Sequence, residues 1–421
     1  MGKTIAEKIL SNHAGRDLRA GDIAICDVDF CFGQDGTSSI IIDSFRKLGV
    51  KKAFDKSRFY MIIDHSAPSP NMGVSAIHKK MREFAKEFDV GMYDIGCGVC
   101  HQLVPQKGHV TCGDLVLGAD SHTCTYGAIN VFSTGVGSTD LAITLASGKN
   151  WIKVPETIRV NVTGKLPKGV SSKDVILHIA KDIGSNGATY KSVEFYGDAI
   201  AEMSVDSRLT ISNMAVEIGA KVGLMEADEK TLAWVREHSK REPNPVKPDP
   251  DARYVAAKKY DISKLVPQVA KPHAVDNVAD AAKLADIKID QAFVGTCTNG
   301  RLEDLETAAK ILKGKTIARG VKFVVAPASA EIFLAAVKKG VIDTFVKSGC
   351  MVVAPGCGPC VGTHNGTLAD GEVAISTANR NFKGRMGNPN SFIYLASPAT
   401  VAASALTGRI TDPREFKTRL S

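Results

Sequence analysis

The sequence predicts an α/β protein built on parallel sheets. Three short apolar runs, each followed at once by Gly, Pro, Ser or Thr, have the length of buried strands and lie at 292–294, 351–354 and 373–375. A helix-like stretch between the first two runs covers 330–339, with Ser329 as its expected N-cap and Gly340 just past its end. Strands that alternate with helices favour a parallel sheet, whose ligands bind outside the carboxyl ends of the strands.

Changes of composition along the chain predict more than one domain. A chain of 421 residues is long enough for two or three domains of ordinary size. An alternating strand pattern at 158–162 begins a new unit, and a charged, proline-punctuated segment at 238–253 is typical of a surface loop or linker. We therefore expect domains that divide the chain into 1–155, 156–280 and 281–421.

Composition narrows the class of protein. Hydrophobic residues make up 44% of the chain, yet no apolar run approaches the roughly 18 residues that span a bilayer. The N-terminus lacks the apolar core of a signal peptide, so we expect a cytoplasmic protein without a membrane partner. The net charge of +8 comes from 53 basic and 45 acidic residues that are interspersed, with no RNA-recognition motif. This pattern argues against a nucleic-acid partner and suits an anionic substrate.

Three cysteines follow predicted strands in glycine-rich loops, and they are Cys297, Cys357 and Cys360. Structural zinc sites and ordinary iron–sulfur clusters usually take four protein ligands. A set of three would leave one metal position open, which is what a Lewis-acid catalyst needs. The CxxC spacing also fits a zinc clip or a redox pair, and loop cysteines also occur as small buried apolar residues. The position of all three at strand ends favours the metal site.

A second CxxC pair, CGVCH at 97–101, has the spacing of a c-type haem attachment site. Haem attachment requires export, and the chain carries no export signal, so we expect a loop cysteine pair near the active site. Ten cysteines in 421 residues, four of them in CxxC pairs, suit a reducing compartment better than a disulfide framework. A redox or haem electron carrier is the alternative class.

Four segments resemble the aconitase superfamily, and within it the large subunits of the isopropylmalate dehydratase type. These segments are ADSHT at 119–123, GTCTNGR at 295–301, PGCGPC at 355–360 and NRNFKGR at 379–385. The resemblance implies three α/β/α domains packed around one 4Fe–4S cluster per chain, without a swivel domain. It implies that Cys297, Cys357 and Cys360 hold this cluster and leave one iron open. The activity it implies is reversible dehydration and hydration of a hydroxy-dicarboxylate.

The resemblance also implies a partner. Single-chain relatives carry a swivelling domain that supplies a serine base and further arginines, whereas only residues 386–421 follow Arg385, too few for another α/β domain. No residue of this chain is an obvious base for removing the C–H proton. We therefore expect a small subunit that carries the swivel domain and supplies this base. A remoter alternative is a non-catalytic, RNA-binding relative.

Two Asp–His pairs follow predicted strands. Asp64 and His65 end the strand at 59–63, where the histidine alone also fits a plain loop position. Beside a Lewis-acid metal the pair becomes a carboxylate-oriented general acid, and the resemblance assigns it protonation of the departing hydroxyl. His122 fits either a direct metal ligand or a histidine oriented by a carboxylate. The resemblance implies that it hydrogen-bonds the metal-bound water or hydroxyl, with Asp120 supporting its ring.

Further site residues are implied by the same resemblance. Glu194, by pattern a solvated strand residue, becomes an active-site carboxylate that faces the open iron. Paired arginines are most often surface charge, but at a strand end their planar forks suit bidentate carboxylate binding. The residues implied to bind substrate are Gln34, Ser121, Asn379, Arg380 and Arg385.

The exact substrate stays open among substituted malates. The sequence around Gln34 departs from the isopropylmalate pattern, which more often has His or Asn before Asp. 3-Isopropylmalate is the first expectation. The alternatives are 2,3-dimethylmalate, citramalate and a homoaconitase-type substrate.

Overall fold

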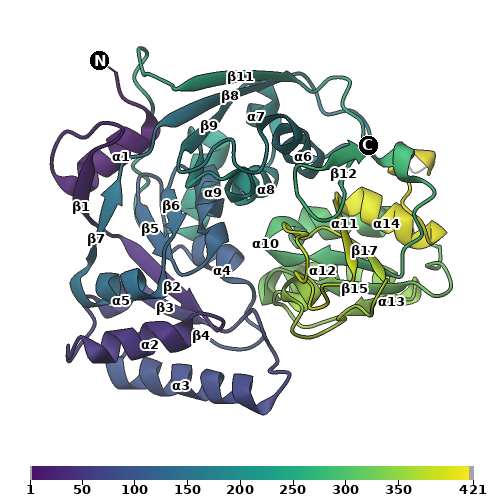
Figure 1. The fold of residues 1–421 in the computed structure, drawn as a ribbon, viewed down its shortest axis with the longest axis horizontal. Coiled ribbons are helices and arrows are strands. Elements are labelled where there is room, and N and C mark those ends of the chain that lie inside the picture. The colour runs from purple at the N-terminus through teal and green to yellow at the C-terminus, as the bar shows by residue number, and fades with distance from the viewer. Residues whose placement is uncertain (1, 417–421) are drawn as a thin grey trace.

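Parallel strands followed by helices organise the computed structural model, which describes residues 2–416. These residues form three units, each built on one sheet, and one two-stranded ribbon (Figure 1). No helix in this range is long and apolar enough to cross a membrane.

The first unit is a five-stranded parallel sheet in the order β4-β3-β2-β5-β6. Its strands are β2 (Phe30–Gln34), β3 (Phe59–Ile62), β4 (Gly91–Tyr93), β5 (Leu115–Gly118) and β6 (Phe132–Gly135). Its helices are α1 (Ile5–Ala14), α2 (Ser38–Lys47), η1 (Lys56–Arg58), α3 (Met72–Phe88), α4 (Cys100–Gln106), η2 (Ser121–Ile129) and α5 (Ser138–Ser147). Helix α2 is amphipathic and turns Ile41, Ile42 and Phe45 toward the core.

An antiparallel ribbon lies beside this unit. It pairs β1 (Ile23–Asp27) with β7 (Lys149–Lys153), and Ile25 stands opposite Trp151. Buried and exposed residues alternate along both strands, as expected for a ribbon with one face on the core and one face in solvent.

The second unit is a four-stranded parallel sheet in the order β10-β9-β8-β11. Its strands are β8 (Thr157–Thr163), β9 (Ser192–Tyr196), β10 (Val222–Met225) and β11 (Ala256–Asp261). Its helices are α6 (Ser172–Ile183), α7 (Asp198–Glu202), α8 (Val205–Asn213), η3 (Met214–Ile218) and α9 (Glu229–His238). The segment at 238–253 is a surface loop within this unit, and it is tied to the first unit because Asn130 accepts a hydrogen bond from the Val246 amide.

The third unit is a seven-stranded sheet in the order β13-β12-β18-β17-β14-β15-β16. Its strands are β12 (Gln268–Ala270), β13 (Val278–Asp280), β14 (Gln291–Gly295), β15 (Lys322–Ala326), β16 (Met351–Val352), β17 (Val373–Ser376) and β18 (Phe392–Ala396). Its helices are η4 (Ala281–Leu284), α10 (Thr296–Asn299), α11 (Leu302–Leu312), α12 (Ala330–Lys338), α13 (Val341–Lys347), η5 (Gly358–Val361), α14 (Pro398–Thr407) and η6 (Pro413–Glu415).

Several local predictions for the third unit can be compared with the observed elements. The runs at 292–294 and 373–375 lie in β14 and β17, and Ser329 caps α12 by accepting a hydrogen bond from the Ile332 amide. Only the first two residues of the run at 351–354 form a strand, because the chain leaves the sheet ahead of Pro355. The two antiparallel strands β12 and β13 belong to this sheet, so the predicted boundary at 280 falls within the third unit.

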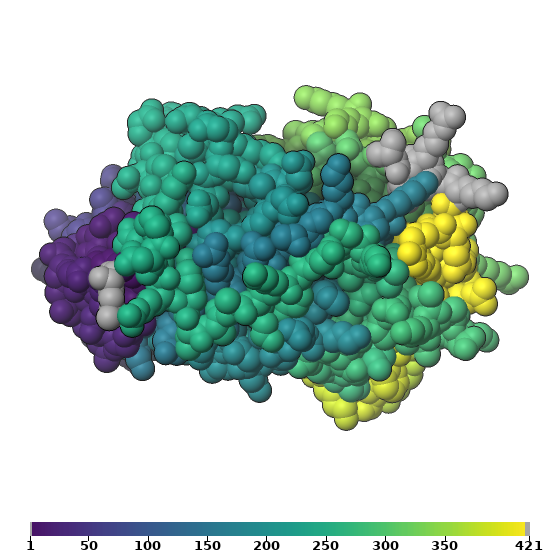
Figure 2. Space-filling view, turned by 90° about the horizontal axis from the view of Figure 1, so that it is seen from above, coloured from purple at the N-terminus to yellow at the C-terminus, as the bar shows by residue number. Residues whose placement is uncertain are grey.

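The third unit packs against the other two. Figure 2 shows the teal second unit lying between the purple start of the chain and the yellow end of the third unit. Backbone hydrogen bonds join the first and third units, from the Cys357 amide to the Asp64 carbonyl at 2.9 Å and from the Val99 amide to the Ala328 carbonyl at 2.8 Å. Loops at the carboxyl ends of β3 and of the third sheet therefore face one another.

Candidate active site

The three predicted cysteines lie in loops at the carboxyl ends of strands of the third sheet. Cys297 follows β14, and Cys357 and Cys360 lie in the turn of η5 after β16. All three are buried, with 5%, 6% and 3% of their surfaces exposed. Burial raises the pKa of Cys297 to about 12, so this thiol ionises only where a positive charge such as a metal offsets the loss of water. All ten cysteines of the chain are free thiols.

Polar N–H groups converge on these sulfur atoms. Asn213 and Asn379 direct their Nδ2 atoms at Cys297 Sγ, at 3.3 Å and 3.6 Å, and Arg385 Nη2 lies 3.3 Å from Cys360 Sγ. Asn379 Oδ1 and Arg385 Nε are buried and have no hydrogen-bond partner among the described residues. Donors aimed at sulfur, together with unpartnered buried polar atoms, fit a bound anionic iron–sulfur group and its ligands.

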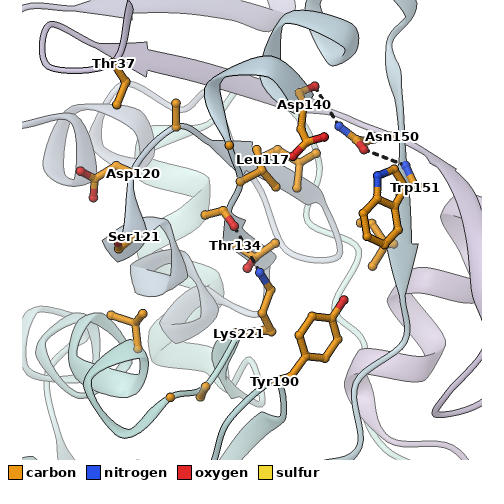
Figure 3. Close-up of a pocket in the computed structure, with 18 of the residues that line it drawn as sticks. Thr37, Leu117, Asp120, Ser121, Thr134, Asp140, Asn150, Trp151, Tyr190 and Lys221 are labelled. Atoms are coloured by element: carbon orange, nitrogen blue, oxygen red, sulfur yellow. Dashed lines mark hydrogen bonds between the residues drawn. The ribbon is translucent and has the colours of Figure 1, made fainter. Parts of the chain in front are cut away.

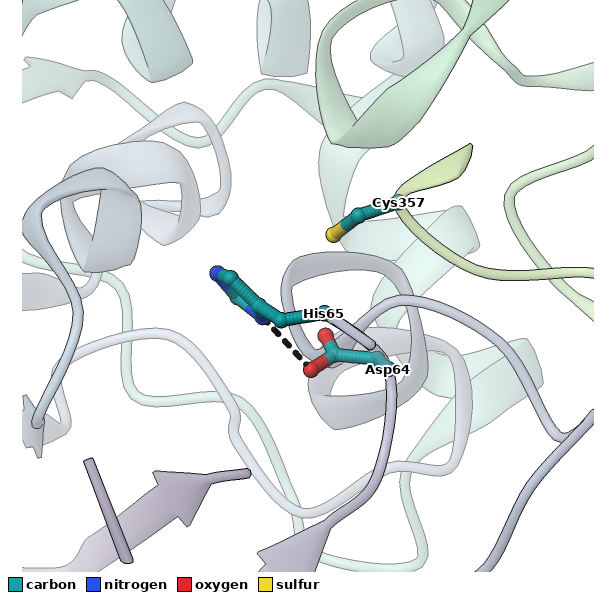
Figure 4. Close-up of side chains that lie close together, drawn as sticks. All are labelled: Asp64, His65 and Cys357. Carbon is teal, nitrogen blue, oxygen red and sulfur yellow. Dashed lines mark hydrogen bonds and ion pairs between the residues drawn. The ribbon is translucent and has the colours of Figure 1, made fainter. Parts of the chain in front are cut away.

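His65 faces the cysteine loop from the first unit. Its Nδ1 lies 2.7 Å from Asp64 Oδ1 and its Nε2 lies 3.3 Å from Asp120 Oδ2. Figure 4 shows Asp64, His65 and Cys357 together, and their ligand atoms lie within 4.8 Å of one another. Burial alone would lower the pKa of His65, but the neighbouring Cys357 and the two carboxylates raise it well above its usual value. Such a ring carries a proton that it can donate.

Asp35 fixes the loop that carries His65. Its Oδ1 accepts hydrogen bonds from the amides of Asp64 and His65, at 3.1 Å and 2.8 Å, and its Oδ2 accepts one from the Ser66 amide at 2.8 Å. Burial opposes ionisation of this carboxyl, yet the histidines and amides around it hold its pKa well below the usual range. Asp35 was not among the predicted site residues, because its donors lie about thirty residues away along the chain.

The second CxxC pair contributes Cys100 to the groups that position the loop carrying Asp64 and His65. The Cys100 amide begins α4 and donates to Asp64 Oδ2 at 2.7 Å, so the segment orients the carboxylate that orients His65. The thiol of Cys100 is fully buried, and burial raises its pKa well above the usual value. Cys100 therefore lies near the active site, as expected for this segment.

Asp120 and Glu217 organise the histidines of the site. Asp120 Oδ1 accepts from His101 Nε2 at 2.7 Å, and Glu217 Oε1 lies 2.7 Å from His122 Nε2. His122 Nδ1 is 3.7 Å from Asp120, so Glu217, and not Asp120, orients the His122 ring. Burial opposes the ionisation of both carboxyls, but the histidines beside them, together with Arg380 beside Glu217, hold the pKa of each below its usual value.

His101 and Glu217 were both missed as site residues by sequence reasoning. His101 was noticed only as the end of the CGVCH segment. Glu217 lies in η3, four residues after Asn213 in the segment NMAVE at 213–217, and no strand end marks it. Its only sequence signal is an acid placed in an otherwise apolar, buried stretch.

The position of Glu194 differs from the expectation that this carboxylate faces the open iron. It is fully buried in the second sheet, where its Oε1 accepts from the Ile5 amide at 2.8 Å and its Oε2 accepts from the Tyr196 and Tyr254 hydroxyls at 2.5 Å and 3.0 Å. These partners satisfy its oxygens at the N-terminus of α1. The structure therefore places Glu194 away from the cysteines, and Glu217 is the glutamate that joins the site.

The predicted substrate-binding residues gather from the first and third units. Arg380 Nε donates to Glu217 Oε1 at 2.8 Å, and Arg380 Nη1 is 3.5 Å from Ser121 Oγ. Gln34 ends β2 and turns its Oε1 back to the Gly36 amide at 2.5 Å. Gln34, Asp120 and Ser121 line a groove of about 620 Å³, part of which Figure 3 shows.

A buried lysine supports the segment that carries Asn379 and Arg380. Lys173 Nζ donates to the carbonyls of Thr377 and Ala378, at 2.9 Å and 2.7 Å, and the side chain is fully buried. Burial lowers the pKa of Lys173 to about 7. The two hydrogen bonds fix the turn immediately before Asn379.

Comparison with known proteins identifies the protein family. The sequence profile of the aconitase family, described as aconitate hydratase, matches residues 7–284 and 274–408. The chain belongs to the aconitase family. The chain is 54% identical over 419 residues to 3-isopropylmalate dehydratase large subunit 1 of Thermotoga maritima, covering 99% of this chain and 100% of that protein.

Other members of the aconitase family extend this finding. 3-Isopropylmalate dehydratase large subunit 2 of Archaeoglobus fulgidus is 53% identical over 421 residues, covering 99% of this chain and 100% of its own. The crystal structure of holo aconitase X from Thermococcus kodakaraensis superposes with a TM-score of 0.51 at 12% identity, covering 86% of this chain and 84% of that chain. The aconitase-like α/β fold predicted from the sequence is thus confirmed.

Proposed function

We propose that this chain is the cluster-bearing large subunit of a hydro-lyase that reversibly dehydrates and hydrates a substituted malate, with 3-isopropylmalate as the first candidate. The observation that carries the proposal is identity of about half over the full length to proteins named 3-isopropylmalate dehydratase large subunit. The arrangement of three cysteines, a protonated histidine and two arginines supports it.

Cys297, Cys357 and Cys360 are the residues that would hold a 4Fe–4S cluster. When bound, such a cluster with one open iron supplies a Lewis acid that polarises the carbon–oxygen bond of the substrate. Asn213, Asn379 and Arg385 donate hydrogen bonds toward the cysteine sulfurs and stabilise their thiolate form.

His65 is the proposed general acid. Asp64 holds one ring nitrogen and Asp120 the other, so the ring is fixed and its proton is stabilised at the site. Donation of this proton to the departing hydroxyl releases water. In the reverse direction the His65 ring accepts a proton from water.

The arginines are proposed to neutralise substrate carboxylates. Arg380 lies beside Ser121, a residue that lines the groove, and Arg385 lies beside Cys360. Planar forks bind carboxylates through two parallel hydrogen bonds. His122 and Arg380 share Glu217, which keeps both oriented.

A smaller partner subunit completes the proposal. The relatives are named large subunits, which points to a small one, and among the described residues no side chain in the site is a ready base for the C–H proton. We assign to the partner the swivel domain and this base. The direct test is interconversion of 3- and 2-isopropylmalate by the chain, with its cluster rebuilt under anaerobic conditions, in the presence of the partner. 2,3-Dimethylmalate, citramalate and homoaconitate assayed alongside would decide the substrate.

A further inference from the structure

The ribbon of β1 and β7 exposes an unusual set of side chains. Ile23, Ile25 and Trp151 point away from the core, and 60%, 61% and 55% of their surfaces are exposed. Ile25 and Trp151 stand directly opposite each other across the two strands. We refer to these three residues as the ribbon face. Large apolar side chains that adjoin one another in solvent mark interaction surfaces.

Two lysines border the ribbon face. Lys153 Nζ and Lys221 Nζ lie 6.0 Å and 5.5 Å from the centre of the Tyr190 ring. Lys153 is the last residue of β7, and Lys221 directly precedes β10. Neither ammonium forms an ion pair with an acid in residues 2–416. Lys149, at the other end of β7, is paired with Asp27 at 3.1 Å. The Lys153 end of the ribbon therefore carries positive charge without an ion pair in this part of the chain, although Lys221 Nζ donates to the Gly135 carbonyl at 3.2 Å.

The ribbon face is continuous with the active site. Trp151, Tyr190 and Lys221 line the same groove of about 620 Å³ that Asp120 and Ser121 line at its other end. Figure 3 shows Asp120 and Ser121 on one side, Trp151 and Tyr190 on the other, and Lys221 between them. Whatever covers this side of the site must also meet the ribbon face.

We propose that the ribbon face, with Tyr190, Lys153 and Lys221, is the docking surface for the small subunit. The inference rests on the proposed function, in which that subunit closes over the site and supplies the base. Trp and Tyr beside aliphatic residues have the composition of an interface hot spot. Lysines without an ion pair among the described residues lie on its border and call for an acidic partner segment, since opposite charges speed association and fix the register of an interface. The partner is therefore expected to present an apolar side chain flanked by carboxylates.

The test uses the complete enzyme and measures activity against the concentration of the small subunit. Trp151→Glu and Ile25→Glu should each raise the concentration needed for half-maximal activity by at least about tenfold, because a buried charge replaces an apolar contact. The maximal rate should be retained at saturation, since neither residue lies among the groups proposed to act on substrate. Leu334→Glu is the matched control, because Leu334 on α12 is similarly exposed, at 59%. This variant should bind the partner normally.

Substitution of the lysine at each end of β7 compares the contributions of the two charges to binding. Lys153→Met should weaken binding of the small subunit, and the effect should diminish in high salt, whereas Lys149→Met should have little effect. The cluster absorbance and thermal melting of each variant establish that it is folded. Sedimentation of the chain alone gives a further readout of self-association.

Three outcomes would overturn the inference. An unchanged half-saturating concentration in Trp151→Glu would show that the small subunit docks elsewhere. A higher KM for substrate without weaker partner binding would make the groove a substrate route. A wild-type dimer that Trp151→Glu dissociates, with partner binding intact, would make a second copy of this chain the occupant. Failure of the wild-type pair to turn over any substituted malate would instead refute the proposed function.

Discussion

At the scale of single residues, His65 stands out because a carboxylate faces each of its ring nitrogens. We expect His65→Ala to lower kcat by roughly 10²- to 10⁴-fold, the usual contribution of general acid catalysis. The cluster should assemble normally, since the histidine is not among the three proposed ligands. Visible absorbance and steady-state rates of the reconstituted variant measure the two effects separately. Near-normal turnover would remove His65 from the mechanism.

The cysteines give a second residue-scale prediction. Changing Cys297, Cys357 or Cys360 to Ser should abolish the brown absorbance of the reconstituted cluster, because each supplies one of three ligands. Cys100→Ser should keep it, because that residue acts through its backbone amide on Asp64. Cys97→Ser should keep it as well. Equal bleaching in Cys100→Ser and Cys357→Ser would show that the ligand set is wrong.

Two glutamates allow a matched comparison. Glu217→Gln weakens charge-assisted contacts to His122 and Arg380, so kcat/KM should fall by about 10- to 100-fold, corresponding to roughly 1.5–3 kcal/mol. Glu194→Gln should leave kcat/KM nearly unchanged and lower the melting temperature, since its partners lie at the start of α1 and in two tyrosines. Kinetics and thermal melting of both variants provide the check. The reverse pattern would restore Glu194 to the site.

These residues also mark the limits of sequence reasoning. The cysteines and His65 could be selected because they follow apolar runs, and strand ends are where ligands bind. Glu217 could not be selected, because its meaning comes from His122 and Arg380, which lie 95 and 163 residues away in the chain. Glu194 has the pattern of a solvated strand residue and only the resemblance implied a role in the site, whereas the fold reveals that the Ile5 amide and two tyrosine hydroxyls satisfy its oxygens.

At the scale of elements, the loop after β3 depends on one buried carboxylate. Asp35→Ala removes the acceptor for three successive amides, so we expect a loss of roughly 1–3 kcal/mol in stability and a lower kcat, with the cluster retained. The pKa of Asp35 is held low in the folded protein, so its contribution is present above the unfolded pKa of about 4 and disappears as pH falls below it. Denaturation of both proteins at neutral and acid pH should therefore show the difference shrinking in acid. A difference that does not depend on pH would contradict this account.

Elements themselves were more predictable than their contacts. Helix α12 has its N-cap where Ser329 indicates, because capping is a local interaction. The predicted boundary at 280 placed the residues of β12 and β13 in the preceding unit, because the pairing of β12 with β18, which brings both strands into the third sheet, joins residues more than a hundred positions apart. Local patterns specify an element, whereas sheet membership is decided by distant partners.

At the scale of the whole molecule, the proposed function needs another chain. Purified alone with its cluster rebuilt, the protein should bind iron and show no dehydratase activity, and adding the small subunit should restore turnover. The physical reason is that the site, as far as residues 2–416 form it, offers a proposed acid and carboxylate-binding arginines but no ready base for the C–H proton. Full activity of the single chain would show that the base lies within these residues.

One backbone hydrogen bond links the loss of the acid site to the loss of the cysteine site. The Cys357 amide donates to the Asp64 carbonyl, so the loop that carries the acid and the loop that carries two cysteines meet across two units. Separation of these units breaks the acid site and the sulfur site in the same event. The protein is therefore expected to lose its function in an all-or-none manner, without a state that keeps a working acid beside a dismantled cluster site.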